Sequence, residues 1–411
     1  MRKMKIDRTV LQNGLRVITI ERDSEVFSMG VGIKAGSLYE GRQNNGISHL
    51  IEHMLFKGTA KRTVEQLNDD VEKLAGDLDI YTTYIDTVMT VSILKDRAQD
   101  CLELVSDMLQ NATFPNKELT LEKKVIIEEI KMAKDDAEDV AYLGLYKAAF
   151  PDEWHKFNIA GTTNSVKSIK VKDLEEFYKA YYIPRNAVVC IVSSFTHQEI
   201  VSLMEKYFGM WQGEKAQLNL RQSPMVKNKN VKGYKKGLGQ THVIYGFDIN
   251  GLTREEDAAL SIINKKLGAG ANSILFKELR EKKGLAYSIY SDMDYMENIR
   301  LFYIYAGISG ENLKSTLKII DEVLEKFKND DSLIDEKSLK LLKDIFITDV
   351  VIAEETPADM IDYLLDGELT YNDPMEYRNM LEKIERVTKE DIKRVVNKIF
   401  KDPIVYILNP K

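Results

Sequence analysis

The chain has 411 residues, of which 44% are hydrophobic and 30% charged, and its formal net charge is −7. This composition is typical of a soluble globular protein of about two domains, each able to bury a core. It argues against a nucleic-acid partner because no basic block stands out, and the Lys-rich stretch 227–236 is more typical of a solvated linker.

Two kinds of segment are not found in the sequence. No apolar run reaches the roughly 18 residues that span a bilayer, so we expect no membrane segment. The first 20 residues carry charge but no apolar core, which argues against a secretory signal. The two cysteines, Cys101 and Cys190, lie in apolar patterns and are expected to be small buried side chains. With no disulfide framework, the sequence predicts a reducing compartment, and we expect a cytoplasmic protein.

The first half of the chain reads as alternating strands and helices. Gln-Asn-Gly between two alternating apolar runs predicts a hairpin, and Gly76 is expected to end an amphipathic helix. The predicted elements are a hairpin over 9–23, a strand over 27–40, helices over 44–57 and 63–76, two strands over 77–94, a helix over 96–112, a long helical region over 116–150, a helix over 168–182, a strand over 186–194 and a helix up to 211.

The second half repeats this order of elements. Residues 212–232 have no periodicity and are the best candidate for a linker. Beyond them come a strand over 241–249, a helix over 253–268, strands over 286–293 and 300–308, a helix over 312–327 and a long helical region over 333–368. The sequence therefore predicts an α+β fold of two similar units, each an antiparallel sheet packed with helices. The expected boundaries are 1–212 for the first unit, 213–231 for the linker and 232–411 for the second unit.

Two of the five histidines lie close together in the text "HLIEH", at His49 and His53. On a helix, residues four apart lie on one face, so both imidazoles can bind one metal ion. Zinc takes histidine nitrogens and a carboxylate oxygen, and a catalytic site keeps one position open for water. Glu52 stands beside the second histidine, where it can take the proton of that water. The simpler alternative, two surface histidines beside a glutamate, explains poorly why the surrounding residues are apolar.

A third ligand has to come from another segment. The helical text "EKKVIIEEIKMAKDD" supplies Glu122, Glu128 and Glu129. Glu122 and Glu129 are two turns apart and share a face that also carries Val125, Ile126 and Met132, so we expect this face to point inward. We assign Glu129 as the ligand and Glu122 as its supporting carboxylate. Taken alone, either glutamate would be assigned to a solvated helix face.

The chain resembles the pitrilysin, insulin-degrading enzyme and mitochondrial processing peptidase family of zinc endopeptidases, as a short bacterial-type member. The resemblance rests on "HLIEHMLFKGT", on the distant Glu129 and Glu122, on "YYIPRNAVVCIVSSF" and "MEKYFGMW" near the end of the first unit, and on "LFKELREKKGLAYSIYS" in the second. It covers nearly the whole chain. Arg280 and Tyr287 match the arginine and tyrosine that complete the active site in this family.

The resemblance implies a zinc metalloendopeptidase that hydrolyses peptides or unfolded segments in an enclosed chamber. His49, His53 and Glu129 would hold one Zn²⁺ per chain, and Glu52 would move the proton of the attacking water to the leaving amine. Tyr287 would stabilise the oxyanion, and Arg280 would hold the substrate or Tyr287.

Substrate is expected to add as a strand to the edge formed by Asp79, Ile80, Tyr81, Thr82 and Thr83. The family often has an Asn-Ala pair where this chain has Asp79 and Ile80, which leaves the usual side-chain contact to substrate open. The glycine-rich 267–273 is expected to be a turn, because no nucleotide-loop lysine follows it.

The family closes four such units around its substrate, and this chain has two. We therefore expect two chains to associate, as a homodimer or with a paralogue, with Arg280 and Tyr287 acting in trans. Two other functions stay open: a non-catalytic or regulatory peptide-binding subunit, and a narrow-specificity processing peptidase. His155, His197 and His242 stand alone and are expected to be ordinary structural histidines.

Overall fold

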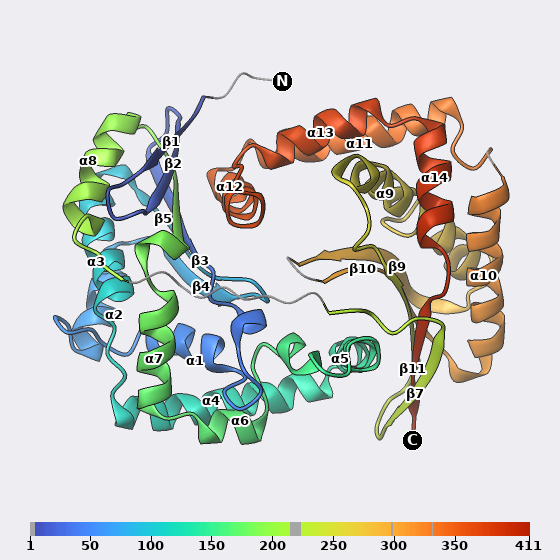
Figure 1. Cartoon of the computed structure of the whole chain (residues 1–411), viewed down its shortest axis with the longest axis horizontal. Helices are drawn as coiled ribbons and strands as arrows, with labels where there is room; N and C mark the ends of the chain where they lie inside the picture. Colours follow the sequence, from blue (N-terminus) through green and yellow to red (C-terminus); the bar gives the residue numbers. More distant parts are fainter. Residues whose placement is uncertain (1–4, 214–222, 297–298, 331) are drawn as a thin grey trace. The chain divides into compact units, whose positions relative to one another are not determined.

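The computed structural model describes residues 5–213, 223–296, 299–330 and 332–411. The chain forms two compact units, and each takes a segment from the other half of the sequence (Figure 1). Unit 1 comprises Met1–Lys131, His155–Leu220 and Val351–Tyr377, and unit 2 comprises Met132–Trp154, Arg221–Val350 and Arg378–Lys411.

Unit 1 contains a six-stranded sheet with the order β1-β2-β6-β3-β5-β4. The predicted hairpin is present, with Ile6 opposite Ile20 across β1 and β2. All neighbours are antiparallel except β2 and β6, which are parallel. The strands are β1 (Ile6–Val10), β2 (Arg16–Glu21), β3 (Val26–Ile33), β4 (Asp77–Thr82), β5 (Thr87–Leu94) and β6 (Ala187–Ser193). Strand β4 lies at one edge of this sheet.

Both faces of this sheet are covered by helices, which explains why β6 reads as an unbroken apolar run and is buried at every residue. One face packs on the main core, which takes in residues of α1, α3, α7 and α8. The other packs on α12, which arrives from the second half of the sequence. The helices of unit 1 are α1 (Ile47–Met54), α2 (Val64–Lys73), α3 (Ala98–Gln110), α6 (Thr163–Ser168), α7 (Val171–Tyr181), α8 (His197–Phe208) and α12 (Pro357–Tyr371), with α4 (Asn116–Asp135) starting here.

The contact between α12 and the sheet depends on two glycines of β3. A Cβ on Gly30 would lie 2.3 Å from Ile361, and one on Gly32 would lie 2.5 Å from Leu369. Glycine at these positions lets the helix approach the strand closely. The same helix carries the fully buried Glu368, whose Oε1 accepts hydrogen bonds from Arg8 and Arg16 at 2.7 and 3.1 Å. The exchanged helix is therefore an integral part of unit 1.

Unit 2 repeats the topology of unit 1 without the first strand. Its sheet has the order β7-β11-β8-β10-β9, with β11 and β7 parallel and the other neighbours antiparallel. The strands are β7 (Lys229–Lys235), β8 (Thr241–Asp248), β9 (Ala286–Tyr295), β10 (Arg300–Ile308) and β11 (Ile404–Pro410). The helices are α5 (Ala137–Ala149), α9 (Arg254–Leu267), α10 (Leu313–Asn329), α11 (Glu336–Ala353), α13 (Glu376–Arg386) and α14 (Lys389–Ile399). The predicted α+β fold of two similar units is confirmed.

The two long helical regions are each divided, and the division makes the exchange possible. The region expected over 116–150 breaks at Asp136, whose side chain accepts hydrogen bonds from the backbone of Glu138 and Asp139 and so caps α5. The region expected over 333–368 breaks before Pro357, which starts α12. After each break, the second helix packs on the sheet of the unit formed mainly by the other half of the chain.

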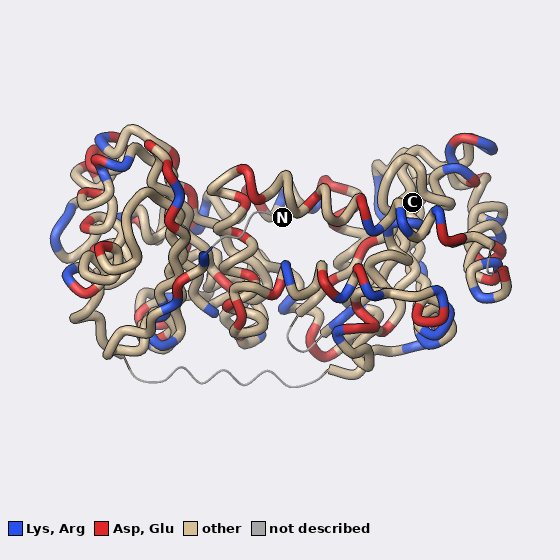
Figure 2. Tube along the Cα trace, turned by 90° about the horizontal axis from the view of Figure 1, so that it is seen from above, with Lys and Arg blue, Asp and Glu red and all other residues tan. Residues whose placement is uncertain are grey.

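The linker expected over 213–231 lies partly outside the described residues, since 214–222 are not described, and its last three residues already belong to β7. Acidic and basic residues are interspersed along the chain of both units (Figure 2). Among the described residues, no helix combines the length and the apolar character required to cross a bilayer. Cys101 and Cys190 are both buried and free, as predicted.

Candidate metal centre

The helix that carries the two histidines, α1, begins at a glycine that gives it no side-chain cap. Gly46 has φ of 92°, and a Cβ there would lie 2.7 Å from the Ala160 carbonyl oxygen. The free backbone donors of the first turn are instead satisfied by Glu40, which accepts hydrogen bonds from the N–H groups of Gly46 and Ser48 at 2.7 and 2.9 Å. Glu40 therefore fixes the start of α1, a role that the sequence analysis did not assign.

Glu40 is 3% exposed, and its third hydrogen bond comes from the Asn45 amide at 2.9 Å. Burial raises the pKa of Glu40 to about 7, and the three hydrogen bonds offset part of this rise. A carboxylate at a helix N-terminus is also favoured by the helix dipole.

The two histidines project from one side of α1, as the spacing predicts. Their ring centroids are 4.7 Å apart and their planes lie at 81° to each other. The opposite side of the helix is anchored in the core by Leu50, Ile51 and Met54, all with no exposed surface. Because these anchors fix the rotation of the helix, the imidazoles are held at a fixed place on its surface.

Glu129 completes a group of three donors. Its Oε2 lies 3.8 Å from His49 Nε2 and 3.6 Å from His53 Nε2, and all three donor atoms lie within 4.8 Å of one another. Donors in a tetrahedral zinc site are about 3.3–3.6 Å apart. Glu129 Oε2 and His49 Nδ1 are also buried polar atoms without a hydrogen-bond partner among the described residues. An acceptor oxygen that is buried, unpaired and aimed at two imidazole nitrogens fits a metal ion.

The helix that supplies Glu129, α4, faces the core differently from what we expected. Its buried residues are Leu119, Glu122, Ile126 and Ile130, whereas Val125 is 44% and Met132 72% exposed. The prediction that Val125 and Met132 point inward is wrong. Glu129 lies at the border of the buried stripe, because it is one turn after the buried Ile126 and directly precedes the buried Ile130. Glu128 points to solvent and pairs with Lys131 at 2.7 Å.

Glu122 supports the second histidine. Its Oε2 is 2.9 Å from His53 Nδ1, and its Oε1 accepts from Lys57 Nζ at 3.0 Å. Burial opposes ionisation of Glu122, but the hydrogen bonds from His53 and Lys57 outweigh it, so the pKa of Glu122 is lowered. Because Glu122 binds Nδ1 of His53, Nε2 is the ring nitrogen of His53 that faces Glu129. The pKa of His49 is lowered to about 4 by burial and by His53, which keeps that imidazole in the neutral form that binds metals.

Glu52 lies next to these donors, and the edge strand holds its side chain. The hydroxyl of Thr82 donates to Glu52 Oε2 at 2.7 Å. Burial raises the pKa of Glu52 to about 7, and the hydrogen bond from Thr82 works in the opposite direction. A carboxyl group with a pKa near neutrality can both accept and return a proton, which is the property expected of a general base.

The predicted substrate strand is the free edge of the sheet of unit 1. Asp79, Ile80, Tyr81 and Thr82 belong to β4, and Thr83 begins the turn to β5. Side chains alternate along it: Ile80 is buried in the core and Thr82 faces Glu52, whereas Asp79 and Tyr81 are exposed. The Tyr81 hydroxyl lies 3.5 Å from Asp362 of α12.

The other two predicted residues, Arg280 and Tyr287, lie in unit 2 and contact each other. Arg280 lies in a π-helix, Phe276–Glu281, and its Cζ is 5.8 Å from the ring centroid of Tyr287 at the start of β9. Tyr287 is 74% exposed, so it is not a core tyrosine. The structure brings these two residues together, and Tyr287 lies on β9, the edge strand of unit 2 that corresponds to β4 of unit 1.

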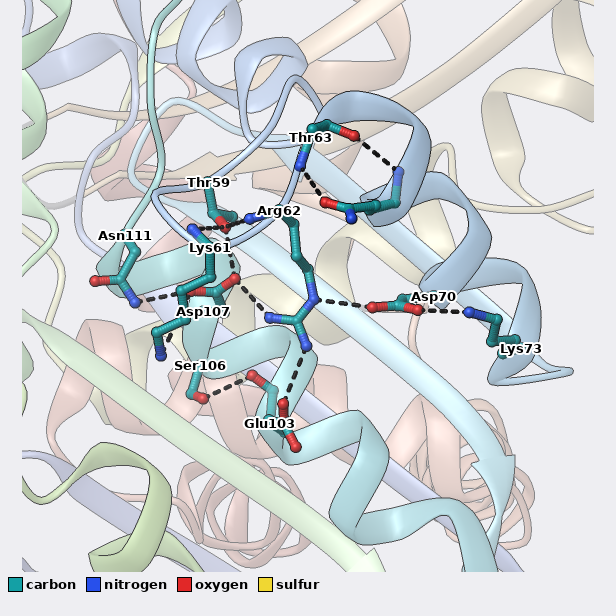
Figure 3. Close-up of polar contacts among 11 residues, drawn as sticks. Thr59, Lys61, Arg62, Thr63, Asp70, Lys73, Glu103, Ser106, Asp107 and Asn111 are labelled. Carbon is teal, nitrogen blue, oxygen red and sulfur yellow. Dashed lines mark hydrogen bonds and ion pairs between the residues drawn. The ribbon is translucent and has the colours of Figure 1, made fainter.

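The chain that follows α1 is held by an ionic cluster around Arg62 (Figure 3). The Arg62 guanidinium donates to Asp107 at 2.7 Å, Asp70 at 2.9 Å and Glu103 at 3.1 Å. Asp107 is 1% exposed and also accepts from Thr59 at 2.6 Å. The cluster ties the segment between α1 and α2 to α3, and so fixes the C-terminal side of the histidine helix.

We expect Arg62→Met to lower the free energy of unfolding by about 2–4 kcal/mol, because it leaves the buried Asp107 without its main counter-ion. Lys73→Met is the matched control: Lys73 also pairs with Asp70, but its side chain is 70% exposed. The control should change stability by less than about 1 kcal/mol. Urea denaturation followed by circular dichroism measures both, and equal effects in the two variants would contradict the structural role of Arg62.

Two of the remaining histidines make hydrogen bonds within the fold. His197 bridges Thr9 and Thr19, at 2.7 Å from each hydroxyl, and His242 Nδ1 lies 2.8 Å from the Tyr305 hydroxyl. His155 is buried. Among the described residues, His49, His53 and Glu129 form the one group of three or more such side chains that can hold a metal ion.

Several proteins of similar sequence are named zinc proteases. Residues 16–163 match the insulinase (peptidase family M16) domain, and residues 168–346 match the peptidase M16 inactive domain. An uncharacterized zinc protease of Bacillus subtilis is 31% identical over 327 residues, which cover 79% of each chain. An uncharacterized zinc protease of Mycobacterium leprae is 29% identical over 407 residues, 97% of this chain and 90% of the relative.

Solved structures agree in fold. A protease from Helicobacter pylori superposes with a TM-score of 0.91 at 24% identity, over 99% of this chain and 100% of the other. A Pseudomonas fluorescens protein described as a peptidase M16 inactive domain has a TM-score of 0.89 at 21% identity, over 99% and 98% of the two chains. By sequence, the chain is thus similar to proteins that are named zinc proteases. The chain belongs to peptidase family M16, the insulinase family.

Proposed function

We propose that the protein is a zinc-dependent endopeptidase that hydrolyses peptides or unfolded segments. The observation that carries this proposal is the convergence of His49, His53 and the unpaired Glu129 Oε2 beside the carboxyl group of Glu52. His49, His53 and Glu129 would hold one Zn²⁺ per chain. When bound, zinc lowers the pKa of a coordinated water and polarises the carbonyl group of the substrate.

The residues of the chain would then do the following. Glu52 takes the proton of the attacking water and returns it to the leaving amine, for which a pKa near 7 is suitable. The free edge of β4 binds the peptide main chain as an added strand, so many side chains are tolerated. Tyr287 donates a hydrogen bond to the developing oxyanion, and Arg280 positions Tyr287 through the contact between their side chains.

We also propose that two copies of the chain associate, as a homodimer or with a paralogue, and that Arg280 and Tyr287 of one chain serve the zinc site of the other. This rests on the family resemblance, in which four α+β units enclose the substrate, and on the two units of this chain. A cytoplasmic location, proposed from the free cysteines, is consistent with the burial of both thiols.

Zinc content tests the metal assignment directly. Wild-type protein should carry about one zinc per chain, and His49→Ala should lose most of it, because two ligands do not retain the ion. Glu128→Ala is the matched control: Glu128 is next to Glu129 on α4, but its side chain is 66% exposed and pairs with Lys131. Elemental analysis of the three dialysed proteins measures the result. Equal zinc in wild type and His49→Ala would contradict the site.

The narrow processing function differs from general peptide degradation in the pattern of cuts. Digestion of a mixed peptide library should give cuts at many sequences if β4 recognises mainly the main chain of the substrate. Cuts confined to one short motif would favour a processing peptidase.

A further inference from the structure

The hydrogen bond between Thr82 and Glu52 joins two parts of the site that are distant in sequence. Thr82 is the last residue of β4, and Glu52 lies on α1. Along β4, Ile80 and Thr82 share the side that faces α1, and Ile80 is packed into the core there. Thr82 Oγ1 donates to Glu52 Oε2 at 2.7 Å, a length typical of a bond to a carboxylate.

This bond holds one oxygen of Glu52 and leaves the other free. Among the described residues, Thr82 is the one hydrogen-bond donor to the Glu52 carboxylate. Oε2 is fixed by it, so Oε1 is the oxygen available to accept a proton. Burial disfavours the charged form of this carboxylate most, Glu129 and Asp79 also disfavour it, and His53 favours it.

The end of β4 is rigid enough to act as such an anchor. Thr82 pairs with Thr87 of β5, and the turn that follows is closed by the Thr83 N–H to the Asp86 carbonyl oxygen at 2.7 Å. The Thr83 hydroxyl also donates to the Asp86 carboxylate at 2.6 Å. The main chain that carries Thr82 is therefore held by the β4–β5 pairing and by the turn that follows it.

We propose that Thr82 is a positioning residue that orients the Glu52 carboxylate and ties it to the strand on which the peptide is bound. The inference rests on the proposed peptidase function. The strand that binds the main chain of the substrate also supplies the donor that fixes the base. A peptide held in register on β4 is thereby held in register with Oε1 of Glu52. The sequence predicted only that Thr82 belongs to the strand that binds substrate. The hydrogen bond to Glu52 adds a second role for this residue.

The test compares Thr82→Val, which removes the hydroxyl at nearly constant volume, with Thr82→Ser, which keeps it. Thr90→Val is the matched control: Thr90 lies on the neighbouring strand β5, opposite Asp79, and no side-chain hydrogen bond of Thr90 is found within the described ranges. Each protein is assayed for kcat and KM on a fluorogenic peptide, for zinc content, and for affinity toward a peptide hydroxamate. Crystal structures of wild type and Thr82→Val give the position of the Glu52 carboxylate.

We expect Thr82→Val to lower kcat about tenfold, the effect of losing one hydrogen bond to a charged group, with KM within about twofold. Hydroxamate binding should weaken by a similar factor, because the probe needs a correctly placed Glu52. Zinc content should stay unchanged, Thr82→Ser should restore kcat, and Thr90→Val should behave as wild type. In the crystal structure of Thr82→Val, the Glu52 carboxylate should leave its wild-type position.

Three results would overturn the positioning role: an unchanged kcat in Thr82→Val, a loss of zinc from that variant, or an unmoved Glu52 in its crystal structure. If wild type hydrolyses no peptide at all, the proposed function fails, and the position of Glu52 still decides the role of Thr82. Movement in Thr82→Val would then support the anchoring bond, and no movement would overturn it.

Discussion

Glu52→Gln should keep its zinc and lose peptide hydrolysis by at least about 10²-fold, the scale of removing a general base. The amide has nearly the same shape as the carboxyl group, and its oxygen can still accept the hydrogen bond from Thr82. The three proposed ligands, His49, His53 and Glu129, are unchanged. The substitution therefore separates proton transfer from metal binding, because it removes only the carboxyl group of Glu52, whose pKa is raised.

The measurements are kcat/KM on a fluorogenic peptide and zinc by elemental analysis, both on protein purified away from host peptidases. Glu128→Gln is the control for an amide substitution at an exposed glutamate and should leave both values unchanged. Near-normal turnover of Glu52→Gln would reject Glu52 as the base. Loss of zinc from Glu52→Gln would mean that Glu52 helps to hold the metal.

The local pattern was sufficient to predict the group of side chains that forms the candidate metal centre. The spacing of His49 and His53 fixes their common face once a helix forms, and Glu129 could be chosen because its side of α4 also carries buried residues. Of the three apolar residues expected on the inward face, Ile126 is buried, whereas Val125 and Met132 are exposed. A 100° step between residues leaves the centre of a helix face uncertain by one residue, and only packing against α1 determines it.

Other parts of the site depend on contacts that sequence spacing does not encode. Glu40 is recognisable only as a distant acceptor for a helix that starts at Gly46 without a capping side chain. Lys57 contacts Glu122 across 65 positions of sequence, a pairing that no local period predicts. The side-chain role of Thr82 also depends on how β4 packs beside α1.

The exchange of helices was missed for a similar reason. The apolar patterns of 116–150 and 333–368 were each read as one long helical region, although Asp136 and Pro357 are ordinary start signals for a new helix. The sequence of an amphipathic helix shows which face is apolar, but it does not specify the surface on which that face packs. In the structure, the buried residues of α12 meet Gly30 and Gly32 of β3, more than 300 positions earlier in the chain. Because the two units have similar topologies, α5 and α12 could each pack on either sheet. In the structure, each packs on the sheet of the unit formed mainly by the other half of the chain.

Mixed dimers of Glu52→Gln and Tyr287→Phe chains should recover activity that neither variant has alone. The reason is the proposed action of Tyr287 in trans. In a mixed dimer, one site would then contain both defects and the other site none. The intact site should give up to about half of the wild-type activity per dimer in a closed two-fold arrangement. Tyr287 is suited to this test because it is 74% exposed, so removing its hydroxyl should not disturb the core of unit 2.

Chains carrying two different affinity tags allow the mixed dimer to be isolated by two successive purifications, which also shows that subunits exchange. Its activity is compared with that of each parent treated in the same way. A tagged mixture of Glu52→Gln with Glu52→Gln is the control, and it should stay inactive because every site lacks the base.

If Tyr287 acts on the zinc site of its own chain, both sites of the mixed dimer stay defective, and activity equals the mean of the two parents. That result from a verified mixed dimer would overturn the trans arrangement while leaving the roles of Glu52 and Tyr287 intact. A protein that stays monomeric at the assay concentration and is fully active would overturn the proposed association itself.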